Sequence, residues 1–509
     1  MTSAEPVSTR RRGFRLVLLA PVFALVALVC WGLSSPVGSS PDDDFHLASI
    51  WCGSGVVAGQ CETGAENDER VVPRDLVSGA VCFATDDEKS ASCQAPDFGT
   101  DVDDTVSTDR GNFAGQYPPV FYFVMSLFAG PNVVISVAVM RIVNAVIFIG
   151  MVTVLAALLP AHRRTPFIWA AAVTVVPLGM FLIPSTNPSS WAILSAAVLW
   201  AALIGYYEAS GARRIALGAY AVVASVMGAG SRADSAVYVG LAIVAVTILT
   251  AQRTRGFLVL SILPAALFVY AFLSAVLAQQ TAVVSTGFDS SAPLEASPAT
   301  LAIANFLMVP ELWTGMFGSG GWGLGWLDTR MPAIVWAIGF LIFGATILIG
   351  IAKAGRRKLL SAGLVFAALW LIPIVILVLS RSLVGAYLQP RYILPIAILL
   401  AGIALWTSSG VIAITGIQRV ITVCALAVAN AVALELNIRR YVTGTDVVGL
   451  NLDAGAEWWW PSIVASPMTV WIVGSLSFVA LLVVLERHVR VADRTVALTT
   501  GATGLLPVR

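Results

Sequence analysis

The chain has 509 residues, of which 58% are hydrophobic and only 12% are charged, and its formal net charge at pH 7 is +1. A soluble protein this apolar, with a mean hydropathy of +0.86, would expose adhesive surface, and a disordered chain would be far more polar. The many apolar runs of about twenty residues instead predict helices that cross a bilayer. Membrane β-barrels are excluded because these runs do not alternate.

Twelve apolar runs are expected to span the membrane, namely 14–33, 133–159, 166–183, 189–207, 213–229, 233–250, 256–278, 332–352, 359–379, 392–407, 416–436 and 462–485. If they alternate in direction, 19 of the 30 Lys and Arg residues but only 4 of the 29 acids share the side of the N-terminus. Cytoplasmic loops carry such a basic excess. The sequence therefore predicts an all-α, polytopic transmembrane bundle of about twelve spans, with the tails 1–13 and 486–509 in the cytoplasm.

The segment 34–116 is the first outside loop, and it is too long for a simple connection. It carries sixteen acids and four bases, and it holds four of the six cysteines, Cys52, Cys61, Cys82 and Cys93. Cysteines on the oxidising side of a membrane predict two disulfides. Three pairings remain open, of which the sequential one closes the shortest loops, and zinc is a lesser alternative because no C-x-x-C spacing is present.

The acidic run P-D-D-D-F-H (41–46) follows the first span directly. Asp43 or Asp44 could simply cap a short surface helix, but a cap needs one acid rather than three. In the functional interpretation, Asp42 or Asp43 is a general base that removes a proton from a sugar hydroxyl. The other aspartate raises the pKa of this base by like-charge repulsion, or it binds a metal. His46 orients one of the two carboxylates. The residues alone leave both interpretations open.

The remaining segment, 117–485, is expected to form the bundle, with outside loops at 280–331 and 437–461. Residues 116–131 are apolar but too short to span, which suits an interfacial or re-entrant helix. The loop 280–331 contains the Gly- and Trp-rich run GSGGWGLGWLDTR, and 437–461 ends in EWWWP. Both aromatic runs are typical of the headgroup level of a membrane.

Arginines on the outside are a minority, and two of them bracket one loop. Arg391 and Tyr392 lie in Q-P-R-Y-I-L-P (389–395), and Arg381 lies just upstream. The arginines could snorkel to the interface, or they could hold a phosphate through the guanidinium fork.

Several other polar residues at span ends or inside spans have two readings. Asn187 in STNPSSW reads first as a turn residue and second as a sugar ligand. Arg232 and Asp234 could pair with each other. Arg141 and Asn144 lie inside a span, where arginine is costly and needs either a ligand or a structural partner. No nucleotide-binding motif and no nucleic-acid-binding patch is present.

Five motifs together resemble one family, an uncharacterised domain-of-unknown-function family of bacterial multi-spanning membrane proteins. They are P-D-D-D-F-H (41–46), Y-P-P-V-F-Y (117–122), N-P-S-S (187–190), G-W-L-D-T-R-M-P (325–332) and Q-P-R-Y-I-L-P (389–395). The resemblance covers about residues 15–485. Asp43 stands where the family pattern P-D-E-x-x-H has Glu, Asp44 is extra, and Pro390 replaces the usual Gly.

That family in turn resembles the GT-C superfamily of glycosyltransferases. The resemblance implies a bacterial plasma-membrane enzyme that moves a sugar from a polyprenyl-phosphate lipid to an envelope glycan, lipid or protein on the outer face. It places Asp42 and Asp43 in the catalytic positions, and it makes Asn187 and Asp328 further candidates for substrate binding beside Arg391. No cofactor is required by the pattern, and a divalent metal ion stays an open alternative. A lipid transporter or flippase and a non-catalytic envelope scaffold are the other functions considered.

Overall fold

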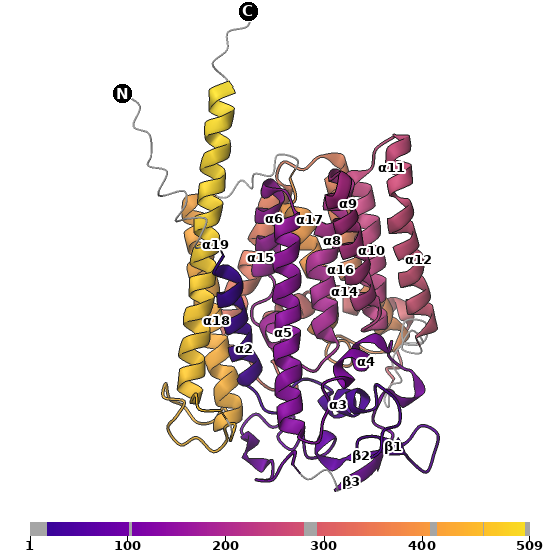
Figure 1. The fold of residues 1–509 in the computed structure, drawn as a ribbon, viewed down its shortest axis with the longest axis vertical. Helices are drawn as coiled ribbons and strands as arrows, with labels where there is room; N and C mark the ends of the chain where they lie inside the picture. The colour runs from indigo at the N-terminus through magenta and orange to yellow at the C-terminus, as the bar shows by residue number, and fades with distance from the viewer. Residues whose placement is uncertain (1–17, 101–103, 279–292, 408–414, 462, 504–509) are drawn as a thin grey trace, which may run out of the picture.

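The computed structural model describes residues 18–100, 104–278, 293–407, 415–461 and 463–503. Its helices are α2 (Ala20–Leu33), α3 (Asp43–Trp51), α4 (Val120–Ser126), α5 (Val133–Leu158), α6 (Ala161–Ala172), α7 (Leu178–Leu182), α8 (Ser189–Glu208), α9 (Gly211–Ala229), α10 (Ala233–Thr250), α11 (Arg255–Leu260), α12 (Ile262–Leu277), α14 (Pro298–Gly315), α15 (Ala333–Ile351), α16 (Arg356–Leu379), α17 (Pro390–Leu405), α18 (Gly416–Val442) and α19 (Pro467–Thr503). Most of them run side by side in one bundle (Figure 1). The predicted tail 1–13 lies outside the described residues.

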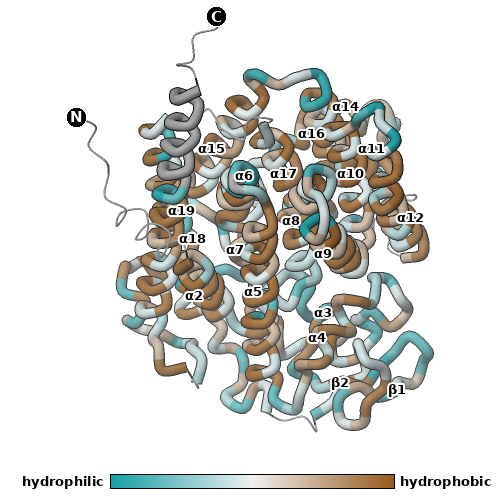
Figure 2. Tube along the Cα trace, turned by 45° about the horizontal axis from the view of Figure 1, so that its top comes forward, coloured by the Kyte–Doolittle hydropathy of each residue, from teal (hydrophilic) through white to brown (hydrophobic). Residues whose placement is uncertain are grey.

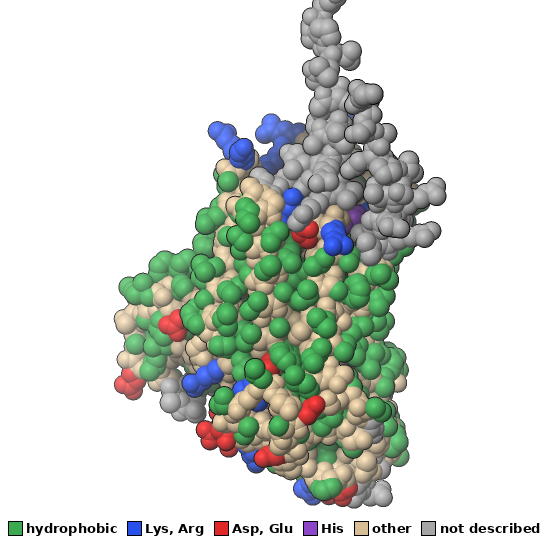
Figure 3. Space-filling view, turned by 90° about the vertical axis from the view of Figure 1, so that its left-hand side faces the viewer, with side chains coloured by type: hydrophobic (Ala, Val, Ile, Leu, Met, Phe, Trp, Pro, Cys, Tyr) green, Lys and Arg blue, Asp and Glu red, His purple; other side chains and the backbone are tan. Residues whose placement is uncertain are grey.

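Within the described part of the chain, nine helical segments are long and apolar enough to cross a membrane, and α2 and α17 are shorter apolar helices. Their outward faces are apolar: Leu273 on α12, Leu341 on α15 and Leu371 on α16 are all exposed. Figure 3 shows a broad hydrophobic surface between an end with Lys and Arg and an end where most of the visible acids gather. Helices satisfy their own backbone, which is what a bilayer demands. The prediction of a multi-pass helical membrane protein is confirmed at this level.

The bundle has two groups of helices joined through its centre. On one side α19 packs against α2 and α18, and α2 packs against α5. On the other side α10 packs against α8, α12 and α16, and α8 packs against α9. The buried helix α17 lies between them and contacts α6, α8, α15 and α16. The hydropathy-coloured tube in Figure 2 shows apolar residues along all of these helices.

Three predicted spans differ from the structure. The run 166–183 is two helices, α6 and α7, separated at residues 173–177, where Pro177 cannot donate a backbone hydrogen bond. The run 256–278 is interrupted at Ser261, between α11 and α12, but the two helices together, Arg255–Leu277, are still one of the nine candidate spans. The last helix, α19, continues well past residue 485, because the polar residues that end the apolar run are also good helix formers.

Helix α14 was not predicted within the loop 280–331. Pro310 and Glu311 interrupt its apolar run, which makes the segment read as a loop. The helix packs against α16. Its buried Asn305 donates to the Ser382 carbonyl and accepts from the Val384 amide, so it holds the turn that leads to α17.

The protein is mostly helical, as predicted, but its first long loop, residues 34–116, also contains strands. It contains a three-stranded antiparallel sheet of β1 (Glu62–Thr63), β2 (Arg70–Pro73) and β3 (Thr105–Thr108), besides the 3₁₀ turns Arg74–Leu76, Ala91–Cys93 and Asn112–Ala114. Strands of two to four residues are too short to give a periodic signal. The loop, α3 and α4 lie at one end of the bundle, opposite the end reached by the C-terminal part of α19 (Figure 1).

Candidate functional site

Helix α3 carries the acidic run, and it is buried rather than lying on the surface. Seven of its nine residues are buried, among them Asp43 and His46. Asp42 precedes the helix in the left-handed conformation, with φ of 60°, and its side chain makes no capping hydrogen bond. A capping role therefore does not account for Asp42, and the three aspartates face three different surroundings.

Asp42 is the most exposed of the three aspartates. Its side chain is 36% exposed, and its Oδ2 lies 2.5 Å from Nη2 of Arg391, which is itself buried. Arg110 approaches Oδ1 of Asp42 at 3.5 Å and also binds Asp44 at 2.6 Å. Burial alone would raise the pKa of Asp42, but the guanidinium groups of Arg391 and Arg110 reverse this and hold it below its ordinary value. Asp42 is thus an accessible, ionised carboxylate in contact with a buried arginine.

Asp43 is fully buried, and its carboxylate is held from two sides. Oδ2 accepts from the backbone amide of Ser40, and Oδ1 accepts from the Thr186 hydroxyl. Burial raises the pKa of Asp43 to about 7, although the charge of Arg141 opposes the rise. Like-charge repulsion from Asp44 is the smallest contribution, so desolvation dominates.

The backbone amide of His46 donates to the Asp42 carbonyl, but within the described residues its imidazole does not hydrogen-bond an aspartate side chain, so the predicted orienting contact is not seen. Its Nδ1 lies 2.8 Å from the Tyr122 hydroxyl, and Tyr117 packs edge-on against its ring. Burial lowers the pKa of His46 to about 3, so the imidazole is neutral at pH 7. Its Nε2 is buried and has no partner in the part of the chain that the structure describes.

Arg391 is buried but only partly satisfied. Nη2 donates to Asp42 and, at 3.0 Å, to the Tyr392 hydroxyl. Nε and Nη1 have no hydrogen-bond partner among the described residues. Arg391 and Pro41 also line a small cavity with room for about one water molecule, and the Trp322–Gly325 stretch of the Gly- and Trp-rich loop forms another part of its wall. Unpaired guanidinium donors beside a cavity are typical of an anion site.

The intramembrane Arg141 is structural. Nη1 donates to the carbonyls of Gly32 and Ser35, and Nη2 donates to the Pro36 carbonyl and the Ser39 hydroxyl. The guanidinium therefore stabilises the turn that links α2 to the acidic run. Because a guanidinium group has five N–H donors, one arginine can bind these three carbonyls and the hydroxyl at once.

Asn144 and Asn187 tie the 185–187 turn to its neighbours. The Asn144 amide donates to the Ser185 carbonyl at 2.8 Å. The Asn187 amide donates to the Pro41 carbonyl at 2.9 Å, and its side-chain oxygen accepts from the Ser189 amide. Asn187 is fully buried, so in this structure it positions the acidic run, and the predicted contact with a sugar stays untested.

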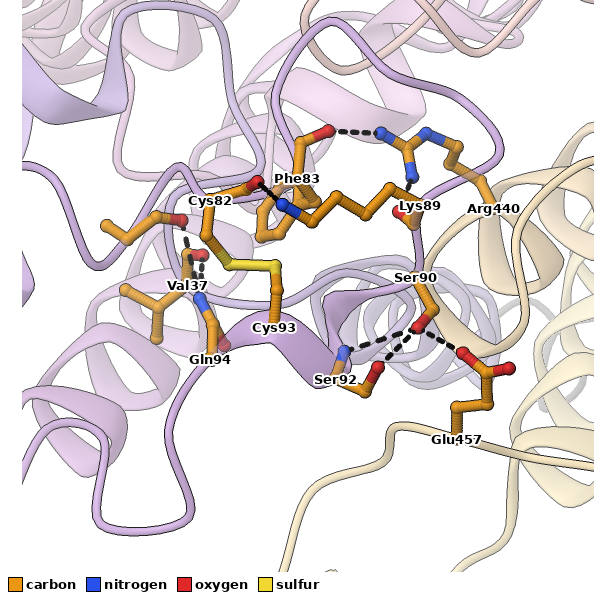
Figure 4. The surroundings of a disulfide bond; sticks show 11 residues. Val37, Cys82, Phe83, Lys89, Ser90, Ser92, Cys93, Gln94, Arg440 and Glu457 are labelled. Carbon is orange, nitrogen blue, oxygen red and sulfur yellow. Dashed lines mark hydrogen bonds between the residues drawn. A yellow bond between two sulfur atoms is a disulfide. The ribbon is translucent and has the colours of Figure 1, made fainter.

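Asp328 forms no hydrogen bond with Asp42 or Arg391 in the described residues. It pairs with the fully buried Arg440 of α18 at 2.9 Å. Arg440 also donates to the Phe83 and Lys89 carbonyls of the loop around the second disulfide (Figure 4). Arg381 is exposed; its backbone carbonyl accepts from the Leu294 amide, and its own amide donates to the Val378 carbonyl. Neither residue is brought to Arg391 by a direct contact.

Both predicted disulfides are present with the sequential pairing, Cys52–Cys61 and Cys82–Cys93. Within the described residues, no group of three or more His, Cys, Asp or Glu residues could hold a metal ion. In Figure 4 the second disulfide closes a segment whose Ser90 donates to Glu457, beyond α18, and whose Gln94 donates to the Val37 carbonyl. The loop is thereby fastened both to α18 and to the turn before the acidic run.

Three contributors to the site, Thr186, Tyr122 and Arg110, carried no assignment from the sequence, and for a fourth, Arg232, only the pairing with Asp234 was predicted. Thr186 and Tyr122 lie in or beside quoted motifs and contact Asp43 and His46. Arg110 is one of only four bases in an acidic loop, which is a usable signal. Arg232 pairs with Asp234, as one interpretation predicted, at 2.8 Å, and its guanidinium also lies 4.7 Å from the centroid of the Tyr392 ring. A polar turn at a span end gave no indication of that second contact.

The fold and this site define a polytopic membrane protein with a buried, charged group at one end of its helical bundle. The chain belongs to the family described as "Predicted membrane protein (DUF2142)", whose model matches residues 25–400. The matched part includes the acidic run, the 185–190 turn and Q-P-R-Y. Comparisons with the curated proteins and with the solved structures gave no match.

Proposed function

We propose that this protein is a glycosyltransferase of the bacterial plasma membrane, which moves a sugar from a polyprenyl-phosphate lipid to a glycan, lipid or protein of the cell envelope. In this proposal the chain crosses the membrane about twelve times, both termini are cytoplasmic, and the 34–116 loop lies outside. The distribution of basic and acidic residues supports this orientation. A GT-C-like arrangement, with the acidic run directly after the first span, belongs to the same proposal.

The observation that carries the proposal is the pair formed by Asp42 and Arg391. Asp42 is accessible and ionised, and Arg391 beside it is buried with Nε and Nη1 unpaired. A base for the acceptor and a cation for the leaving group are the two functions that such a transfer needs. Because the two side chains are 2.5 Å apart, the base and the cation would act on the same bound substrate.

The reaction follows from these two groups. The acceptor hydroxyl gives its proton to the Asp42 carboxylate, and its oxygen bonds to the anomeric carbon of the sugar. The bond between that carbon and the phosphate oxygen breaks, and its electron pair stays on the phosphate, where Arg391 stabilises the added negative charge. The displacement is single, so the sugar is transferred with inversion.

Donor binding would also improve Asp42 as a base. The pKa of Asp42 is low because Arg391 and Arg110 favour its charged form. A bound phosphate would offset the charge of Arg391 and add a negative charge nearby, and both effects raise the pKa of a carboxylate. The base would then be strongest when the donor is in place.

Arg391→Lys tests the proposal in the purified protein with a synthetic polyprenyl-phosphate sugar. Lys keeps the positive charge but loses the planar fork, so transfer is expected to fall by about 10²–10³-fold, as when one donor to a developing negative charge is removed. Exposed Arg255→Lys is the matched control. Transfer at the parent rate by a folded Arg391→Lys protein would refute the role of Arg391.

A further inference from the structure

The two carboxylate oxygens of Asp42 have different surroundings. Oδ2 accepts from the buried Nη2 of Arg391 at 2.5 Å. Oδ1 accepts no hydrogen bond within the part of the chain that the structure describes, and Nη2 of Arg110 stays 3.5 Å from it. A charge-assisted hydrogen bond is shorter, at about 2.7–2.9 Å. Oδ1 is therefore the oxygen that is left to take the proton of the acceptor, on the side of Arg110.

Asp44 binds the guanidinium that would otherwise reach this oxygen. Its Oδ2 and Oδ1 accept from Nε and Nη2 of Arg110 at 2.6 and 3.1 Å, which is the paired geometry of an arginine–carboxylate fork. The Cζ atom of Arg110 also lies 5.7 Å from the centroid of the Phe45 ring. Arg110 thus pairs with Asp44 and only approaches Asp42.

The backbone that carries Arg110 is fixed, whereas its side chain can turn. The Arg110 amide donates to the Thr108 hydroxyl at 3.0 Å, and the Asn112 amide donates to the Ser49 hydroxyl of α3 at 2.8 Å. The Arg110 side chain is 45% exposed, so much of it is surrounded by solvent. Without the Asp44 carboxylate, the attraction of opposite charges would draw the guanidinium onto Oδ1 of Asp42. The acceptor would then have to displace it.

We infer that Asp44 is a positioning residue: it binds Arg110 and thereby keeps Oδ1 of Asp42 free for the acceptor hydroxyl. The inference rests on the proposed function, because it gives Asp44 a part in that reaction. The alternative is that Asp44 only stabilises α3, since a carboxylate in the first turn suits the positive end of the helix dipole. The two roles differ in one respect, because only the positioning role acts through Arg110.

Sugar transfer by the purified full chain separates the two roles, with synthetic polyprenyl-phosphate hexoses and pentoses as donors and a bacterial envelope extract as acceptor. Asp44→Ala releases Arg110, and kcat should fall by about tenfold because a hydrogen bond between charged groups must break before Oδ1 can accept a proton. Donor binding should not change, because Arg391 is untouched. Adding Arg110→Gln to Asp44→Ala should restore most of the parent kcat, since no guanidinium is left to occupy Oδ1. Asp44→Glu keeps a carboxylate for Arg110 and should stay close to the parent.

The matched control is Asp104→Ala, because Asp104 forms an exposed ion pair with Arg74 at 2.9 Å elsewhere in the same loop. It should leave kcat unchanged, alone or with Arg74→Gln. Transfer at the parent rate by Asp44→Ala would overturn the inference and leave the proposed function standing, and so would a double variant no faster than Asp44→Ala. If a thermal melt shows that Asp44→Ala is unfolded, Asp44→Ser decides in its place. Absence of transfer by the parent would overturn both the proposed function and the role of Asp44.

Discussion

Replacing the buried Asp43 with Asn should change how stability depends on pH. The pKa of Asp43 is raised from 3.8 to about 7 because the carboxylate is desolvated. Between these values the unfolded chain has lost the proton that the folded protein still holds, so the free energy of unfolding falls as pH rises. Above about pH 7 the folded protein ionises as well, and the loss is complete. A pKa difference of this size corresponds to about 4 kcal/mol.

Asn imitates the protonated form of Asp43. Its side-chain oxygen accepts from the Ser40 amide, and its NH₂ group can donate to the Thr186 hydroxyl, which turns to accept. Asp43→Asn should therefore lose little stability at pH 4.5, and at pH 8 it should be more stable than the parent by up to about 4 kcal/mol. The difference between the two proteins isolates Asp43 from all other titrating groups.

The assay is unfolding of both proteins in the same detergent, followed at several pH values from 4.5 to 8. The predicted result is a difference in the free energy of unfolding that grows in favour of the variant as pH rises. Asp44→Asn is the control. Asp44 is not fully buried, and it forms an ion pair with the exposed side chain of Arg110. A difference that is the same at pH 4.5 and pH 8 would refute the claim that the fold holds Asp43 protonated.

Two further predictions concern the scaffold around the site. Thiol alkylation without reductant should leave the four loop cysteines unmodified, and labelling of most of them would contradict the disulfides. Arg141→Met removes the donor from three backbone carbonyls and one hydroxyl in the 32–39 turn, and it should lower the free energy of unfolding by at least about 3 kcal/mol. Exposed Arg255→Met should have no measurable effect, and equal stability of the two variants would show that Arg141 is not a structural clamp.

Hydropathy and charge predicted most of the bundle, because a membrane-spanning helix needs a long apolar run and its ends follow the distribution of Lys and Arg. The prediction failed where a short polar or proline residue interrupts an apolar segment. Pro177 divides one expected span, and α14 was not predicted because Pro310 and Glu311 interrupt its apolar run. The sheet in the long loop escaped detection because its strands have two to four residues.

The candidate site was predictable in part. Asp42, Arg391 and Tyr392 were singled out from their order and membrane side, and the structure places them in contact. Burial was not readable from sequence: the acidic run looks like a solvated stop, yet Asp43 is fully buried. Contacts between residues far apart in the chain, such as Arg110 with Asp44 or Asp328 with Arg440, depend on tertiary packing that no local pattern records.

The central claim is that Asp42 removes the acceptor proton beside a phosphate held by Arg391. The most direct measurement is sugar transfer from a synthetic polyprenyl-phosphate donor by purified Asp42→Asn protein, with donor binding and thermal stability measured on the same sample. Asn keeps the size of the side chain but cannot act as a base, so transfer should fall by about 10²–10⁴-fold while the protein stays folded and still binds donor. Asp44→Asn should be much milder. Transfer at the parent rate by a folded Asp42→Asn protein would contradict the account.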